Sequence, residues 1–172
     1  DICEQLHFRK GYRVFKTSFE RKNLSFVVRK TDNKLNELCH ILSSVQGSAV
    51  VYSRTRRGVE EYAGKLRAAG ISAEYFHAGL DPVIKTERQT DWLKGNTRVL
   101  VATNAFGMGI DKGDVRLVIH TGFPDSMEAY YQEAGRAGRD GNRAYAVALL
   151  GPQDITDIKR HIARLLRLLF IM

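Results

Sequence analysis

Residues 48–70, SAVVYSRTRRGVEEYAGKLRAAG, join an apolar run short enough for a β-strand to a stretch with helical periodicity. The run SAVVY has no polar alternation, which is typical of a strand covered on both faces. Four apolar residues then recur at the spacing of one helix face, namely Val59, Tyr62, Ala63 and Leu66. Gly70 is well suited to end that helix. The stretch therefore predicts one strand and helix of an α/β fold.

Similar units lie on both sides of this stretch. Apolar runs of strand length recur as LSFVV (24–28), SAEYFHA (72–78), RVLVAT (98–103), RLVIHT (116–121) and AYAVALL (144–150). A second helical stripe consists of Leu35, Leu38, Cys39, Leu42 and Val45. Asp81 and Pro82 form an N-cap and a first-turn proline for a helix that closes near Gly95. Strands alternating with helices predict a mostly parallel sheet with helices on both faces.

The last part of the chain is expected to add one more helix. Gly151 and Pro152 end the strand at 144–150, and Asp154 begins a pattern of apolar residues at helical spacing. These residues are Ile155, Ile158, Ile162, Leu165 and Leu169. We expect this helix to pack on the sheet.

Composition limits the class of protein. The 172 residues are 44% hydrophobic, which suits one globular domain, and no run of eighteen apolar residues offers a transmembrane span. The first residues lack the apolar core of a signal peptide. Cys3 and Cys39 are far apart, so neither a disulfide framework nor a zinc site is indicated, and we interpret both as thiols. A cytoplasmic protein without a membrane partner is expected.

The balance of charge is strongly basic. The formal charge of +8 predicts a surface that attracts polyanions, because clustered Lys and Arg release counterions when they neutralise nucleic-acid phosphates. The alternative is a solvated basic face without a ligand.

The stretch YYQEAGRAGRDG, residues 130–141, carries the most specific chemistry. It sets Arg136 and Arg139 one helical turn apart, beside small residues that leave the guanidinium groups unscreened. Arginine stays charged at any working pH, and its planar fork matches the oxygens of a phosphoryl group. The pair is therefore predicted to meet phosphate. The alternative is a pair of salt bridges with Glu133 and Asp140 at a helix end.

A glycine-rich loop, ATNAFGMGID at residues 102–111, ends another predicted strand. Gly107 and Gly109 permit a tight turn whose amide groups can face a phosphate or a ribose, and Asp111 offers an acceptor for ribose hydroxyls. The alternative is a glycine turn with an aspartate cap. Ligands of open parallel sheets gather beyond the carboxyl ends of the strands, which selects this loop together with residues 53–57, 77–80 and 122–126.

These motifs carry a resemblance that covers most of the chain. Residues 130–141 resemble motif VI of superfamily 2 helicases, and with TNAFGMGIDKGDVRLVIH (103–120) they are similar to the RecQ family of DNA helicases. From SFERKNLSFVVRK (18–30) to YAVALL (145–150), the segments follow the order of that family's second RecA-like motor domain. The resemblance implies a RecA-like three-layer α/β sandwich. Gly113 departs from the family, in which proline usually follows the lysine.

The resemblance also implies a division of the chain. Residues 1–24 would be the end of a preceding motor domain and the hinge that joins the two domains. Residues 25–172 would be the second RecA-like domain, with an ending, RLLRLLFIM, that departs from the family pattern. The chain would then be an excised piece. The alternative for residues 1–24 is an ordinary frayed terminus.

Contacts with ATP are implied for two of the motifs. Arg139 would be the catalytic arginine finger at the γ-phosphate, and a finger supplied by a second domain contributes ~10³ to 10⁵ in rate. Arg136 would be its catalytic partner, and Gln132 would arrange the same network. Gly109 and Asp111 would complete the nucleotide contacts. No residue is expected to bind a metal ion directly.

Contacts with single-stranded DNA are implied for the other loops. These residues are Thr103 and Asn104 in the glycine-rich loop, and Ser53, Arg54, His77 and Gly79 after two other predicted strands. Polar groups at strand ends hold the phosphate backbone without reading its sequence. The alternatives are a structural histidine at position 77 and a solvated helix start at Arg54, Arg56 and Arg57.

One absence in the sequence completes the prediction. The chain contains neither GxxxxGK[ST] nor a DExH string, so ATP and Mg²⁺ would be bound mainly by a first motor domain. This chain alone is expected not to hydrolyse ATP.

The predicted function is therefore the second motor domain of a RecQ-type, ATP-dependent DNA helicase. The family resemblance implies 3′ to 5′ unwinding in recombination and repair, with single-stranded and duplex DNA and the first RecA-like domain as partners. The location would be the cytoplasm, or the nucleoid in a bacterium. Two rivals remain, another superfamily 2 motor that acts on RNA or translocates without unwinding, and a non-enzymatic basic module that only binds nucleic acid.

Overall fold

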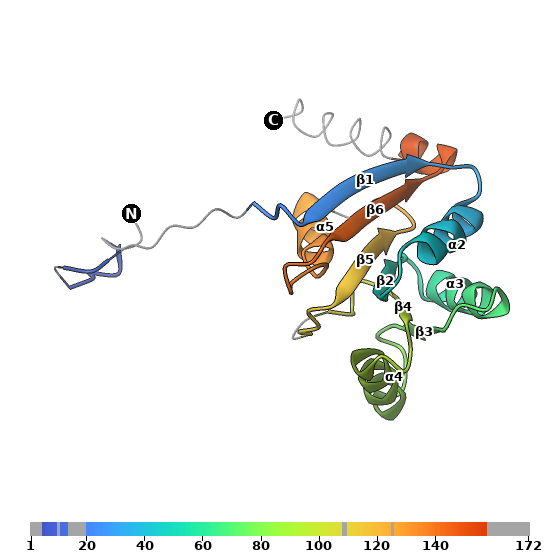
Figure 1. The fold of residues 1–172 in the computed structure, drawn as a ribbon, viewed down its shortest axis with the longest axis horizontal. Coiled ribbons are helices and arrows are strands. Elements are labelled where there is room, and N and C mark those ends of the chain that lie inside the picture. The colour runs from blue at the N-terminus through green and yellow to red at the C-terminus, as the bar shows by residue number, and fades with distance from the viewer. Residues whose placement is uncertain (1–4, 10, 14–19, 108–109, 125, 158–172) are drawn as a thin grey trace, which may run out of the picture.

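The computed structural model describes residues 5–9, 11–13, 20–107, 110–124 and 126–157 (Figure 1). Within these residues one six-stranded sheet has the order β1-β6-β5-β2-β4-β3, and every pairing in it is parallel. The strands are Leu24–Lys30 (β1), Ser48–Tyr52 (β2), Ala73–Phe76 (β3), Val99–Ala102 (β4), Val115–His120 (β5) and Ala144–Leu150 (β6). The six predicted strands and their parallel arrangement are confirmed.

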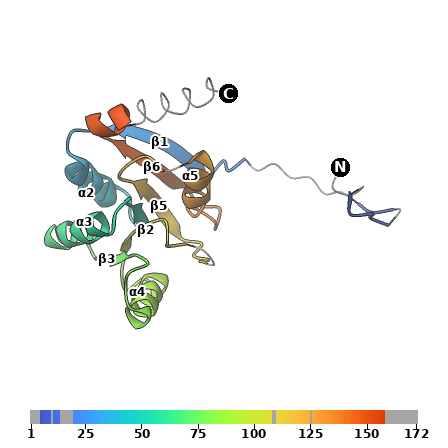
Figure 2. The ribbon, with the colours of Figure 1, turned by 180° about the vertical axis from the view of Figure 1, so that it is seen from behind.

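Helices cover both faces of the sheet, as Figure 2 shows from behind. They are Lys34–Ser44 (α2), Arg56–Ala68 (α3), Pro82–Lys94 (α4) and Met127–Ala134 (α5). Leu42 of α2 and Leu66 of α3 belong to one core cluster with Val51. Trp92 of α4 and Ala134 of α5 belong to a second cluster that includes Leu100. Because neighbouring strand residues point to opposite faces, the two clusters define the predicted three-layer sandwich.

The helix ends follow from their caps. Asp81 accepts a hydrogen bond from the Val83 amide at 2.8 Å and precedes Pro82, the first residue of α4. Gly95 ends this helix in the left-handed conformation, with φ of 83°. Thr55 caps α3 in the same way, accepting from the Gly58 amide at 3.0 Å. The predicted start and end of α4 are confirmed.

After β6, the chain begins the helix expected near Asp154. Residues 152–157 are helical, and the Asp154 carboxylate accepts from the Gly151 amide at 2.6 Å and pairs with Lys34 at 2.5 Å. The remaining predicted positions, namely Ile158, Ile162, Leu165 and Leu169, lie outside the described residues, as do RLLRLLFIM and Cys3. Cys39 is a free thiol whose pKa is raised by burial.

Two kinds of feature are absent from the described residues. No helix there is long and apolar enough to cross a membrane. In the same part of the chain, no three His, Cys, Asp or Glu side chains gather as metal ligands.

Candidate nucleotide and nucleic-acid site

The carboxyl ends of the parallel strands bring the predicted loops together. The amide of Ser53 donates to the Ala102 carbonyl at 2.9 Å, and that of Thr103 donates to the Phe76 carbonyl at 3.2 Å. Likewise the Thr121 amide donates to the Tyr52 carbonyl at 2.9 Å. The loops after β2, β3, β4 and β5 therefore start side by side at one edge.

A pocket of about 190 Å³ opens at this edge. Its lining comes from three of the predicted loops, from the last residues of β2 and β5, and from α5, and consists of Tyr52, Ser53, Arg54, Asn104, His120, Gly122, Phe123, Pro124, Ala129 and Glu133. Ser53, Arg54 and Asn104, all predicted to contact DNA, thus share one concave surface. The other three predicted DNA contacts are not part of its lining.

Of these three residues, His77 and Thr103 are buried. His77 is 5% exposed, its Nε2 lies 2.9 Å from a Glu60 carboxylate oxygen, and its ring stacks on Tyr75. Thr103 is also buried. Gly79 is exposed, and a Cβ there would lie 2.9 Å from Nη1 of Arg56. These contacts favour a structural part for the His77 ring and bring Arg56 beside the predicted loop.

A buried histidine–carboxylate contact that the sequence did not reveal forms part of the pocket lining. His120 Nε2 and Glu133 Oε2 are 2.7 Å apart, and the His120 side chain is 2% exposed. The imidazole stacks on Tyr52, with ring centroids 5.3 Å apart, and lies 5.0 Å from the Tyr130 ring. Burial raises the pKa of Tyr52 to about 12, so its hydroxyl stays protonated. His120 follows three apolar residues at the end of β5, and this histidine was the signal available in the sequence.

Arg136 lies against the glycine-rich loop. Its Nη1 donates to the Gly107 carbonyl, and its Nε is buried without a hydrogen-bond partner among the described residues. Gly107 has φ of 132°, and a Cβ at this position would overlap the guanidinium of Arg136. Glycine is therefore required here for both the backbone conformation and the close approach.

Arg139 reaches the same loop closer to the rim. Its Nη1 donates to the Ile110 carbonyl at 2.9 Å and lies 3.0 Å from Oδ1 of Asp111. The side chain of Arg139 is 36% exposed and that of Asp111 is 88% exposed. The structure thus joins Arg136, Arg139 and Asp111 at one loop, while Gln132 is exposed on α5. Gly109 lies outside the described residues.

The local conformation of the two arginines differs from the sequence prediction. Helix α5 ends at Ala134, and Arg136 and Arg139 lie in the turns that follow rather than one helical turn apart. The reason is the pair of glycines, since Gly135 caps α5 and Gly138 adopts φ of 62°.

The alternative salt bridges at this position are wrong. Glu133 pairs with His120, and Asp140 pairs with Arg116. The hydrogen bond from Arg116, followed by that from Asn142, lowers the pKa of Asp140 to about 2. The two arginines are therefore not engaged by the neighbouring carboxylates.

The edge fits an anionic nucleotide on its own chemistry. It offers a partly exposed guanidinium at Arg139, an unpartnered buried Nε at Arg136 and an exposed carboxylate at Asp111. Guanidinium groups bind phosphate, and carboxylates accept hydrogen bonds from ribose hydroxyls.

Comparison with known proteins agrees with this geometry. Residues 33–141 match the family described as the helicase conserved C-terminal domain. The chain is 42% identical over 158 residues to the ATP-dependent DNA helicase RecQ of Bacillus subtilis, a match that covers 90% of this chain and 26% of that protein. It is 43% identical over 157 residues to the ATP-dependent DNA helicase hus2/rqh1 of Schizosaccharomyces pombe, which covers 90% of this chain and 12% of that protein.

A solved structure gives the same result for the fold. The Escherichia coli DEAD-box protein SrmB, crystallised with the regulator of ribonuclease activity A, matches with a TM-score of 0.71 at 29% identity. The match covers 78% of this chain and 81% of that one. The family match spans more than half of the chain, whereas the chain spans only about a quarter of the Bacillus subtilis relative. The chain belongs to the helicase conserved C-terminal domain family, and it is a RecA-like C-terminal helicase domain of the RecQ type.

Proposed function

We propose that this chain is the second motor domain of an ATP-dependent DNA helicase that unwinds duplex DNA in the 3′ to 5′ direction during recombination and repair. The observation that carries the proposal is Arg139, whose guanidinium is partly exposed beside the exposed carboxylate of Asp111. A cation held at an open rim can reach a ligand bound by another domain.

At the nucleotide, Arg139 is the arginine finger and Arg136 its partner. Bound ATP, with Mg²⁺, supplies the phosphoryl group whose transfer drives the motor. Gln132 helps to arrange the same network, and Gly109 and Asp111 contact the nucleotide. The carbonyls of Gly107 and Ile110 support this assignment, because they fix the two guanidiniums at main-chain oxygens, and the carboxylate that pairs with Arg139, that of Asp111, is itself exposed.

At the nucleic acid, the loops after β2, β3 and β4 hold the backbone of single-stranded DNA. Ser53, Arg54 and Asn104 form the contact surface, supported by their shared pocket. Gly79 adds a contact, and the buried side chains of His77 and Thr103 orient the loops beside it. The net charge of +8 attracts both single-stranded and duplex DNA.

The first RecA-like domain of the same protein is the essential partner. It binds most of ATP and Mg²⁺, because this sequence has neither a GxxxxGK[ST] loop nor a DExH string. Residues 1–24 are the end of that domain and the hinge, and residues 25–172 are the second domain. The chain alone lacks ATPase activity.

Replacing Arg139 with alanine in the two-domain helicase tests the proposal. We expect kcat for ATP to fall ~10³-fold or more, because the charge at the transferring phosphate is lost. The dissociation constant for single-stranded DNA should change less than about threefold, since phosphate contacts elsewhere remain. Steady-state ATPase assays and fluorescence anisotropy measure the two quantities.

The matched control is Arg143→Ala, in the same segment. Its guanidinium lies over the Tyr145 ring, 5.6 Å from the centroid, instead of at the 103–111 loop. This variant should keep its ATPase activity. Weakened DNA binding with unchanged turnover in Arg139→Ala would favour a binding module, and turnover stimulated by RNA but not DNA would favour the other superfamily 2 motor.

A further inference from the structure

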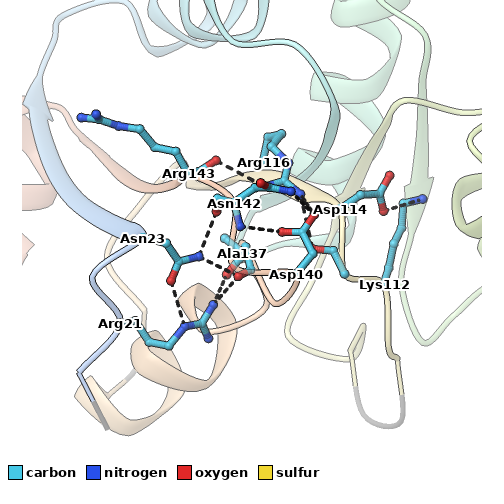
Figure 3. A network of polar contacts seen from close by, with 11 residues as sticks. Arg21, Asn23, Lys112, Asp114, Arg116, Ala137, Asp140, Asn142 and Arg143 are labelled. Carbon is cyan, nitrogen blue, oxygen red and sulfur yellow. Dashed lines mark hydrogen bonds and ion pairs between the residues drawn. The ribbon is translucent and has the colours of Figure 1, made fainter. Parts of the chain in front are cut away.

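Two side chains just before β1 grip the turn that carries the two arginines (Figure 3). Arg21 Nη2 donates to the carbonyls of Ala137 and Gly138, at 2.9 and 2.7 Å. Its Nε also donates to the Asn23 side chain at 3.4 Å. A residue 116 positions earlier in the sequence thus holds the peptide groups that lie between Arg136 and Arg139.

Asn23 completes this grip from the same side. Its Nδ2 donates to the carbonyls of Gly138 and Asn142, at 2.7 and 2.9 Å. The main-chain carbonyl of Asn23 accepts a hydrogen bond from the Ala144 amide at 2.9 Å. A Cβ at Gly138 would lie 2.6 Å from this Nδ2, so the fit requires glycine at that position. The Asn23 side chain and the turn at Gly138 are therefore complementary in both shape and hydrogen bonding.

The fold does not depend on this grip for its strand pairing. β1 is already joined to β6 along its whole length, from Leu24 opposite Ala144 to Lys30 opposite Leu150. The turn itself needs external support, because Gly135 and Gly138 give its backbone unusual freedom. Holding the carbonyls of Ala137 and Gly138 restricts the directions in which the flanking arginines leave the main chain.

We propose that Arg21 and Asn23 are positioning residues for the arginine finger. They tie the segment through which the chain enters this domain to the turn that presents Arg139 and Arg136. Movement of that segment is thereby transmitted to the guanidiniums at the nucleotide. This inference rests on the proposed function, in which a first motor domain precedes residue 24.

The test uses Asn23→Asp and Arg21→Ala in the two-domain helicase. Asn23→Asp keeps the side-chain shape but replaces the donor with an acceptor facing two carbonyls. We expect kcat for ATP to fall ~10- to 100-fold with KM nearly unchanged, because misplacement of a catalytic group by about 1 Å can cost ~10² in rate. Arg21→Lys should recover part of the activity lost in Arg21→Ala, since it keeps a charged donor. The control, Lys22→Ala, removes an exposed side chain between them and should leave kcat unchanged.

A double-mutant cycle separates positioning from general damage. With Arg136→Ala and Arg139→Ala both present, Asn23→Asp should cause no further fall in kcat, because neither guanidinium remains to be positioned. A full additional fall would overturn the inference, as would wild-type kcat in both single variants. If Asn23→Asp proves unstable in thermal unfolding, Arg21→Ala takes its place in the cycle. A wild-type kcat for Arg139→Ala would instead refute the proposed function itself.

Discussion

Two groups of arginines at the carboxyl edge of the sheet are held in opposite ways. Arg136 and Arg139 donate to the main-chain carbonyls of another loop, and Arg139 also pairs with Asp111 of that loop at 3.0 Å. At the start of α3, Arg56 is exposed, and Arg57, with 89% of its side chain exposed, pairs with Glu61 of its own helix. A guanidinium in a fixed position suits a reaction that needs positive charge at one point. Exposed guanidiniums instead suit contacts with the phosphates of a nucleic acid, which do not depend on its base sequence. Similar charge can therefore serve two purposes at one edge.

Displacing the guanidinium of Arg136 should have the largest effect of the tests that compare the two groups of arginines. Gly107→Ala introduces a Cβ where Arg136 lies, at a backbone φ of 132° that only glycine adopts easily. In the two-domain helicase we expect kcat for ATP to fall ~10²-fold through misplacement. The strained backbone should cost about 1–3 kcal/mol of unfolding free energy. Steady-state ATPase assays and urea denaturation measure these effects.

Gly64→Ala is the matched control for this change. Gly64 lies inside α3, and a Cβ there would have no heavy atom within 4 Å. The substitution should raise helix stability by about 0.5–1 kcal/mol and leave kcat unchanged. An active Gly107→Ala helicase would mean that close contact with the loop does not set the position of Arg136.

A smaller effect is expected for the exposed arginines at the start of α3. Arg56→Ala should weaken single-stranded DNA binding and reduce the slope of log K against log salt by about 0.7, because one phosphate contact is lost. Its kcat at saturating DNA should stay at the wild-type value. Anisotropy titrations at several salt concentrations measure the slope, with Lys94→Ala at the far end of α4 as the control. A loss of kcat at saturating DNA would erase the distinction between the two groups.

The smallest effect concerns how firmly the 135–142 turn is fixed. The pKa of Asp140 is lowered to about 2 from 3.8, first by the hydrogen bond from Arg116. Because the folded pKa is the lower one, this carboxylate stabilises the fold above pH 3.8, and its contribution is lost as the pH falls toward 2. In Arg116→Met the pKa should rise toward 3.8, as followed by carboxyl NMR titration. An unchanged pKa would show that Arg116 does not hold this turn.

The fold was predictable because its signals are local. Uninterrupted apolar runs marked the buried strands, and Asp81 with Pro82 marked the start of α4. Once the sheet was taken as parallel, the rule for carboxyl ends located the loops at 53–57 and 103–111 without further information. Periodicity and capping are encoded within a few residues, so the sequence reveals them directly.

The details of the site depend on contacts between distant residues. His120 and Glu133 are thirteen positions apart, and Arg21 meets Gly138 across 117 positions. Neither spacing has a periodicity that a sequence displays. The local error at Arg136 has a different cause, since a glycine after Ala134 can either continue a helix or end it. The His77 ring likewise contacts Glu60, a residue of another element.

The pairing of β1 with β6 has a consequence for synthesis on the ribosome. Among the strands in the described residues β1 is made first, yet its hydrogen-bonded neighbour in the sheet, β6, is made last. Until residue 150 has left the exit tunnel, the backbone of β1 has no partner strand, and closing so long a segment is slow. The main-chain donors and acceptors of β1 therefore stay unpaired through most of the elongation of this domain, and the sheet can be completed only after β6 has been made.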